Sequence, residues 1–139
     1  MSDDVRTMIE QYNDAWNRHD VDAICAMHAE GMVFENHTAG ERAEGDAVRG
    51  HIAGIFEAWP DLAFETRSLH DGSGHAVCEW TASATHQRRV TRGSRVAEPT
   101  GAALSWHGVD AFTIADGRIA RKDVYSDSVT ILRGLGLLD

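Results

Sequence analysis

The hydrophobic pattern of the chain changes its period at Pro60, and this change limits the folds that the sequence can adopt. Before Pro60, apolar residues recur at three- and four-residue spacing, which is typical of helices with one buried face. Proline stops the last of these helices because it lacks a backbone N–H and disfavours helix in the residue before it. After Pro60, apolar and polar residues alternate, which is typical of strands. The pattern predicts helices over residues 4–18, 21–29 and 47–58, the third capped by Asp46.

Four strands are predicted after Pro60, and one short strand is predicted among the helices. The short strand covers residues 32–36 and leads into a polar loop, T-A-G-E-R-A-E-G. The later strands cover residues 62–70, 76–86, 104–114 and 119–125, and Asp127-Ser128 opens a C-terminal turn or short helix. This order predicts an α+β fold, one domain over residues 1–139, with the helices on one face of a curved antiparallel sheet.

The strand over residues 104–114 carries a carboxyl group on its apolar face. Trp106, Gly108, Phe112 and Ile114 share this face by strict alternation, and so does Asp110. Burial disfavours the charged form of a carboxyl group, so we expect a raised pKa for Asp110. A protonated aspartate in an apolar site can donate a hydrogen bond to an oxygen that gains negative charge.

Three more polar residues fall on faces that are otherwise apolar. Tyr12 lies within the stripe of the first helix, Asn36 shares a face with Phe34, and His86 ends the strand over residues 76–86. Each has a simpler interpretation: a core tyrosine bonded to a carbonyl, an asparagine that turns the chain, and a strand-end histidine. Tyr12 and Asp110 together would suit the stabilisation of an oxyanion in a dry cavity.

Composition and missing motifs exclude several classes of function. The net charge of −9 argues against nucleic acid and anionic membranes as partners. With no signal peptide and no long apolar run, a cytoplasmic location is expected. The sequence contains no phosphate loop, dinucleotide fingerprint, G-x-S-x-G or H-E-x-x-H motif, so no cofactor is expected. Its eight histidines lack paired ligand spacing, so no metal is expected. Cys25 and Cys78 lie in apolar contexts and are interpreted as reduced.

Residues 87–103 form a connection without a clear period. Arg88, Arg89, Arg92 and Arg95 lie in it, a third or so of the basic residues of an acidic protein. A solvated hairpin tip explains this composition. The alternative is a mobile lid that attracts an anionic group on a ligand.

Several segments resemble the SnoaL-like polyketide cyclases, which belong to the nuclear-transport-factor-2-like superfamily together with ketosteroid isomerase and limonene epoxide hydrolase. The segments are Q-Y-N-D-A-W-N-R-H-D-V-D-A-I (11–24), M-V-F-E-N (32–36), E-W-T-A-S-A-T-H (79–86), E-P-T-G (98–101), H-G-V-D-A-F-T-I-A-D-G-R-I-A-R (107–121) and D-S-V-T-I-L-R-G-L-G (127–136). The resemblance implies a cone-shaped α+β barrel with a deep apolar pocket, often a homodimer through the outer face of the sheet.

The resemblance also implies roles for individual residues. Against ketosteroid isomerase, Tyr12 and Asp110 match the two oxyanion-hole donors. The position of that enzyme's general base holds Asn36, and since an amide is no base, steroid isomerisation by that route is not expected. In the cyclases, an acidic residue near the end of the last strand moves the proton; Asp123 and Asp127 are the candidates here. Alternation groups Asp123 with Ile119 and Tyr125, and we expect Val124 and Ala120 to face the pocket instead.

The sequence thus leaves three functions open. The first is a small-molecule enzyme for aldol cyclisation or isomerisation next to a carbonyl of a polyketide- or terpenoid-like ligand. In it, Asp110 and Tyr12 would polarise the carbonyl, and His86 or Asp123 would move the proton. The second is a non-catalytic ligand-binding or dimerisation module, and the third is an epoxide hydrolase, which needs an inward-facing arginine that the pattern does not reveal. The expected ligand contacts are Asn36, Trp16, Phe34, Phe56, Trp59, Trp80, Trp106, Phe112 and Val124.

Overall fold

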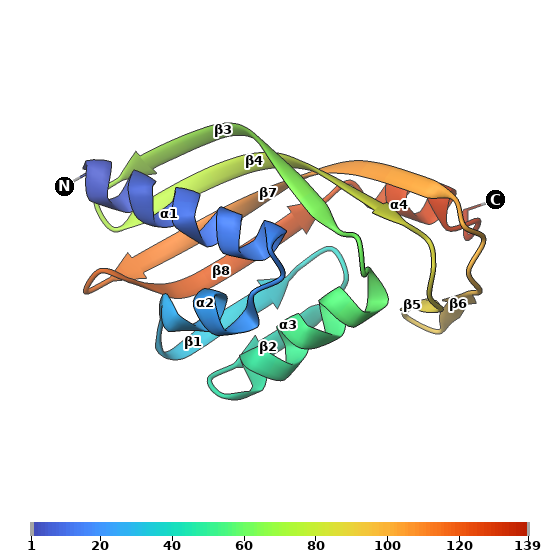
Figure 1. The fold of residues 1–139 in the computed structure, drawn as a ribbon, viewed down its shortest axis with the longest axis horizontal. Helices are drawn as coiled ribbons and strands as arrows, with labels where there is room; N and C mark the ends of the chain where they lie inside the picture. Colours follow the sequence, from blue (N-terminus) through green and yellow to red (C-terminus); the bar gives the residue numbers. More distant parts are fainter. Residues whose placement is uncertain (1, 139) are drawn as a thin grey trace.

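A curved sheet with helices against its inner face forms the body of the protein (Figure 1). The computed structural model describes residues 2–138. Six strands make the main sheet in the order β2-β1-β8-β7-β4-β3, and only the β1–β8 pair within it is parallel. These strands are β1 (His28–Asn36), β2 (Glu41–Glu44), β3 (Ala63–Gly72), β4 (His75–Thr85), β7 (Ala103–Ala115) and β8 (Arg118–Ser126). The α+β fold class predicted from the sequence is confirmed.

Three helices precede the long strands, and a fourth short helix follows them. A separate two-stranded hairpin, β5 and β6, interrupts the connection between β4 and β7. The bounds are α1 (Ser2–Asn17), α2 (Val21–Ala26), α3 (Ala47–Ala58), α4 (Ser128–Gly134), β5 (Val90–Arg92) and β6 (Arg95–Ala97). In Figure 1, α1 crosses the sheet over β3 and β4, while α3 lies beside β1 and β2.

The helical stripes bury the residues that their spacing predicts. Ile9, Tyr12 and Trp16 of α1 are all buried, and α1 packs mainly on β3. Asp20 caps α2 by accepting a hydrogen bond from the Ala23 N–H at 3.0 Å. Asp46 occupies the cap position of α3, but its side chain makes no capping hydrogen bond, unlike the prediction.

The second helix is shorter than predicted, and the strand after it is longer. Helix α2 ends at Ala26, and His28 begins β1 instead of continuing the helix. Pairing with Ile119 of β8 gives His28 a strand partner, and the register shifts after it. Gly31 takes a φ of +73° within this irregular stretch, which glycine adopts without a Cβ clash.

Three short strands lie in segments that the sequence pattern assigned to loops. Strand β2 is charged at three of its four positions, so no clear alternation marks it, and its backbone pairs with the edge of β1. Strands β5 and β6 are three residues each, too short for a period to be recognised.

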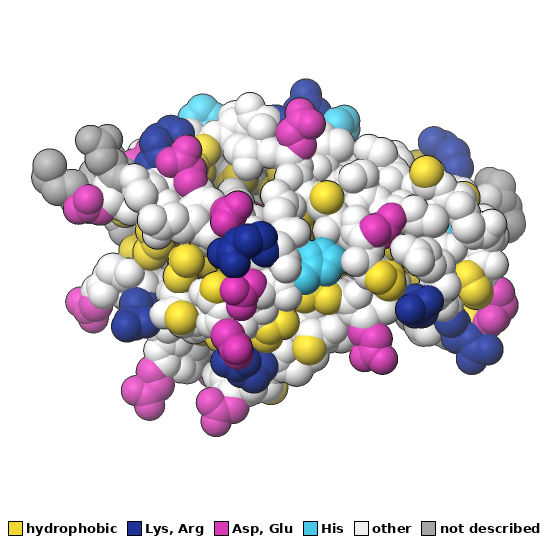
Figure 2. Space-filling view, in the orientation of Figure 1, with side chains coloured by type: hydrophobic (Ala, Val, Ile, Leu, Met, Phe, Trp, Pro, Cys, Tyr) yellow, Lys and Arg dark blue, Asp and Glu magenta, His cyan; other side chains and the backbone are white. Residues whose placement is uncertain are grey.

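Charged side chains cover the helical face of the protein. Figure 2 shows acidic and basic groups interspersed there, with small apolar areas between them. None of the helices within residues 2–138 combines the length and the hydropathy needed to cross a membrane.

Candidate active site

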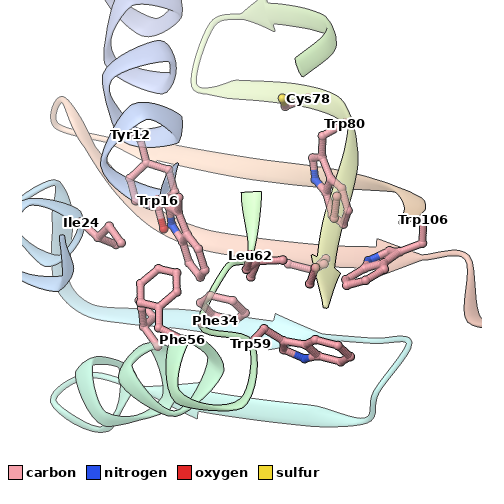
Figure 3. Close-up of a cluster of buried hydrophobic side chains, with 14 of the residues drawn as sticks. Tyr12, Trp16, Ile24, Phe34, Phe56, Trp59, Leu62, Cys78, Trp80 and Trp106 are labelled. Atoms are coloured by element: carbon pink, nitrogen blue, oxygen red, sulfur yellow. The ribbon is translucent and has the colours of Figure 1, made fainter. Parts of the chain in front are cut away.

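A cavity of about 270 Å³ lies between the helices and the inner face of the sheet. Four indoles reach it from different elements, Trp16 from α1, Trp59 from the end of α3, Trp80 from β4 and Trp106 from β7 (Figure 3). Other lining residues include Asn13, Phe34, Asn36, His51, Ile55, Leu62, Phe64, Thr66 and Val124. Seven of the predicted ligand contacts therefore line the cavity: Trp16, Phe34, Asn36, Trp59, Trp80, Trp106 and Val124.

Two predicted ligand contacts lie outside the cavity wall. Phe56 stacks on the His19 ring, with ring centroids 4.1 Å apart, and Phe112 packs edge-on against Tyr12 at 5.7 Å. Both are buried, and neither is among the lining residues. Each packs instead against a residue of α1 or of the segment that follows it: Phe112 against Tyr12, and Phe56 against His19.

Gly108 of β7 sets the position of one wall of the cavity. It pairs with Trp80 across the sheet, and the six-membered ring of that indole lies where a Cβ on residue 108 would point. A Cβ there would be 2.7 Å from Cζ3 and closer still to two other ring carbons. Glycine therefore allows the indole to lie flat against β7.

Asp110 is buried on the inner face of β7, as its alternation predicts. Asp110 is 5% exposed and lines the cavity. Beside it lies Lys122 of β8, also 5% exposed and also lining the cavity. The Lys122 Nζ and the Asp110 Oδ2 are 3.8 Å apart, an ion pair inside an apolar wall.

Aromatic rings surround the amine of Lys122. Its Nζ lies 3.9 Å from the Trp16 ring centroid, 5.0 Å from that of Tyr12 and 5.1 Å from that of Phe34. Ring faces attract a cation, and more strongly where water is excluded. The sequence analysis missed this residue, although Lys122 alternates with Val124 and is the one lysine of the chain.

Burial opposes the charge on both members of this pair. It raises the pKa of Asp110, against the opposing effects of the Lys122 charge and of the nearby Trp80 indole. It lowers the pKa of Lys122, against the opposing charges of Asp110 and Cys78. Burial therefore brings the proton affinities of the two groups closer together than those of a free carboxyl group and a free amine.

The hydroxyl of Tyr12 is directed away from this pair. It forms a 2.9 Å hydrogen bond with the His28 Nε2, and Tyr12 does not line the cavity. Burial raises the pKa of the Tyr12 phenol, and burial together with the Lys122 charge lowers the pKa of His28 to about 4. The predicted pairing of Tyr12 with Asp110 as two converging donors is therefore not what the geometry provides, because His28 takes the hydroxyl.

His86 and Asp123, the predicted proton carriers, also lie outside the cavity wall. His86 is fully buried next to Trp59, and its Nδ1 lies 3.3 Å from the Thr100 hydroxyl. Asp123 is on the outer face of β8, where it accepts hydrogen bonds from Arg121 and contacts the His37 Nε2 at 2.7 Å. Burial opposes the charge of Asp123, but these hydrogen bonds lower its pKa.

Asp123 also belongs to a cluster that has the spacing of a cation site. The ligand atoms of Glu35, His37 and Asp123 lie within 4.8 Å of one another. Arg121 occupies this cluster already, with its Nη2 at 2.6 Å from Glu35 and 2.9 Å from Asp123. The guanidinium supplies the positive charge that a metal would otherwise bring.

The β5–β6 hairpin brings basic side chains to the outer end of the cavity. Arg89 and Arg92 both line it; Arg89 pairs with Glu98 at 2.6 Å. Burial lowers the pKa of Arg92, while Glu41 favours its charge. Within the described residues, the Arg92 Nε is buried and has no hydrogen-bond partner.

Other buried polar atoms on the cavity wall share this property. Among residues 2–138, four have no protein hydrogen-bond partner: Nε1 of Trp16 and of Trp80, Nε2 of His51 and Oδ1 of Asp110. A buried polar group without a partner is costly, about 1–3 kcal/mol.

A model of the SnoaL-like domain family matches residues 9–122. AclR from Streptomyces galilaeus, a proposed hydroxylase, is 23% identical, with 100% of this chain and 89% of that one covered and a TM-score of 0.85. IdmH from Streptomyces antibioticus, a proposed polyketide cyclase, is 21% identical, with 94% of this chain and 97% of that one covered and a TM-score of 0.78. TerC, co-crystallised with polyporic acid, is 14% identical, with 94% of this chain and 96% of that one covered and a TM-score of 0.76. No curated protein matches the chain.

Proposed function

Since this chain belongs to the SnoaL-like domain family, we propose that it is an enzyme that moves a proton beside the carbonyl group of an apolar small molecule. One observation carries the proposal: Asp110 and Lys122 lie 3.8 Å apart on the wall of an aromatic cavity. An acid and a base held side by side on the wall of an aromatic cavity are what enolisation requires. The proposal keeps Asp110 and replaces His86 and Asp123 by Lys122.

The pair can supply both proton transfers of the reaction. In its charged form, the Lys122 ammonium donates a hydrogen bond to the carbonyl oxygen, and the Asp110 carboxylate takes the proton from the neighbouring carbon. The enolate that forms either attacks a second carbonyl of the same ligand, closing a ring, or regains the proton at another carbon. A water-poor cavity strengthens the stabilisation of the enolate oxygen, typically by several kcal/mol.

The wall of the cavity favours a flat, apolar ligand. Four indoles and two phenylalanine rings, Phe34 and Phe64, line it. Their faces and edges suit aromatic or polycyclic ligands of polyketide or terpenoid type. The similar structure TerC was crystallised with polyporic acid, and this supports an aromatic ligand.

An acidic group on the ligand would complement Arg92. Its partly buried guanidinium has an unpartnered Nε within the described residues, and a carboxylate would satisfy it. We expect Arg92→Gln to weaken the binding of 2-naphthoic acid more than tenfold and that of its methyl ester little. Arg95→Gln, which removes the same charge from an exposed hairpin position opposite Arg92, is the control. Equal effects of the two substitutions would contradict this part of the proposal.

Deuterium exchange tests the proton transfer directly. The probe is 2-tetralone in D₂O, an apolar ketone whose α-protons are followed by NMR. We expect the protein to accelerate exchange, and Asp110→Asn to reduce the acceleration at least about 100-fold, the usual contribution of a positioned acid or base. Asp123→Asn, an equivalent change on the outer face, should retain the full rate.

Two results would separate enzyme from binding module. If 2-tetralone quenches the fluorescence of the cavity tryptophans without any accelerated exchange, the domain binds ligands and does not catalyse this step. If Asp110→Asn exchanges as fast as the wild-type protein while its circular dichroism is unchanged, the assigned pair is wrong.

The outer face of the sheet offers a surface for a second copy of the chain. Tyr125 of β8 is 50% exposed there and stacks on the His37 ring at 4.5 Å. We propose homodimerisation through this face. Sedimentation of the wild-type protein should give twice the mass of the chain, and Tyr125→Glu should give the monomer; a wild-type monomer at micromolar concentration would contradict the proposal.

A further inference from the structure

The basic residues of this chain are divided unequally between two types. Twelve are arginine, and Lys122 is the single lysine. This lysine is also the most enclosed, since its side chain is 6% exposed and lines the cavity. Arginine would supply a positive charge at this position, but it stays protonated in proteins, whereas a lysine can lose its proton and become a nucleophile.

We propose that Lys122 forms an imine with the carbonyl carbon of the ligand, so that the enzyme works on a covalently bound ketone or aldehyde. This inference rests on the proposed function, because it assigns a covalent role to the same site. It also narrows the substrate class: esters and acids do not form imines with an amine, so the reacting group is a ketone or an aldehyde.

The chemistry balances with the groups that line the cavity. The unprotonated Nζ attacks the carbonyl carbon, and one of its two protons passes to the carbonyl oxygen, which becomes a hydroxyl. Asp110, which holds the proton that Lys122 has lost, returns it to that hydroxyl, and water leaves as the C=N bond forms. The protonated imine then attracts electrons from the neighbouring C–H bond more strongly than the ketone does, and Asp110 takes that proton.

The surroundings of the amine favour this use of it. The Asp110 Oδ2 lies 3.8 Å from its Nζ, within reach for proton exchange through a small shift. The other titratable groups near it, Tyr12, Cys78 and His28, are held neutral. Burial raises the pKa of Tyr12 and Cys78, and burial together with the Lys122 charge lowers that of His28. Burial lowers the pKa of Lys122 itself, which increases the unprotonated fraction near neutral pH.

Reductive trapping tests the imine. The protein is mixed with 2-tetralone, treated with sodium borohydride, and examined by intact-mass spectrometry and peptide mapping. The expected result is one adduct on Lys122, heavier by the ketone less one oxygen atom. The adduct should be absent from Lys122→Met and from Lys122→Arg, which retains the charge. With Asp110→Asn, the rate of adduct formation should fall at least about 100-fold.

A second amine outside the cavity supplies the matched control. Arg121→Lys places a lysine one residue away, on the outer face of β8 beside Glu35 and Asp123. We expect the adduct on residue 122 alone, because only that amine is desolvated. Equal labelling of residues 121 and 122 would overturn the inference.

The outcomes distinguish the inference from the function on which it rests. Fluorescence quenching and accelerated exchange without an adduct on Lys122 would overturn the imine and leave the proton-transfer function standing. Neither quenching nor exchange with the wild-type protein would overturn both. If Asp110→Asn forms the adduct on Lys122 as fast as the wild-type protein does, the carboxyl group has no role in the dehydration step.

Discussion

Adding one methyl group at Gly108 is predicted to damage both the stability and the cavity of this protein. The new Cβ would lie 2.7 Å from Cζ3 of Trp80 and closer to Cζ2 and Cη2, whereas carbon atoms pack best at about 3.5–4.0 Å. The indole must therefore move by about 1 Å, and the open space on its other side is the cavity. Overpacking of this kind costs about 1–3 kcal/mol of unfolding free energy.

Urea denaturation and ligand titration measure the two effects of Gly108→Ala. We expect a lower midpoint with an unchanged slope, which indicates lost stability without a change in the surface exposed on unfolding. Quenching by 2-tetralone should weaken at least about fivefold, since about 1 kcal/mol of ligand contact is lost.

Gly50→Ala is the matched control for this prediction. Gly50 lies within α3, and a Cβ there would meet nothing within 4 Å. Alanine replaces glycine in a helix with a gain of about 0.5–1 kcal/mol, so the same chemical change should raise stability there. If Gly108→Ala matched Gly50→Ala in midpoint and bound 2-tetralone normally, the reasoning about the wall formed by Trp80 would be refuted.

Three further predictions concern the buried polar groups. His28 has a pKa lowered to about 4 from 6.5, so the stability it contributes is present above pH 6.5 and is lost as the pH falls towards 4. Over that pH range, His28→Gln should lose about 2 kcal/mol less unfolding free energy than the wild-type protein, a figure that allows for the partial exposure of His28. Tyr12→Phe should cost about 1–2 kcal/mol in urea denaturation, because the 2.9 Å bond to His28 is lost, yet retain deuterium exchange within about threefold; a 100-fold slower exchange would restore the hydroxyl to the reaction. Asp110→Leu alone should lower the free energy of unfolding by about 3 kcal/mol, because it leaves the Lys122 charge buried without a partner. The double variant with Lys122→Met should lose less, because it leaves no uncompensated buried charge. A loss in the double variant equal to the sum of the two single losses would contradict this.

The inner face of β7 was predictable because its alternation runs without interruption. Trp106, Gly108, Asp110 and Phe112 follow one another at every second position, and each is buried. A shift by one residue would have exposed two large aromatic side chains, so the register was strongly specified. The position of Asp110 therefore followed from the sequence.

Strand β8 was harder to interpret because its alternation changes phase. Ile119 is buried, but the next buried positions are Lys122 and Val124. The pairing with β7 passes from Ile114–Ile119 to Thr113–Arg121, so Ala120 is an extra residue of the kind found at a β-bulge. A sequence pattern cannot place such a bulge. Two signals could have indicated Lys122: its alternation with Val124, and its uniqueness among thirteen basic residues.

The roles assigned to Tyr12 and Arg92 depended on contacts that no periodicity reveals. Helical spacing correctly buried Tyr12 but could not show that His28, expected in a helix, begins a strand and takes its hydroxyl. The basic loop had two interpretations, a solvated tip and a ligand-facing element. Arg92 lines the cavity through a hairpin of three-residue strands, and such a contact depends on tertiary packing.

A titration of the single lysine measures whether Lys122 is desolvated beside Asp110. With ¹³C-labelled lysine, the protein gives one side-chain signal to follow as the pH is raised, because Lys122 is the only lysine. We expect a midpoint below the ordinary lysine pKa of about 10.4, since burial among aromatic rings opposes the charge. We also expect Asp110→Asn to lower the midpoint further, because the attraction that favours the ammonium is removed. A midpoint at or above the ordinary value would contradict the claim that this amine and Asp110 are held in a dry, working site.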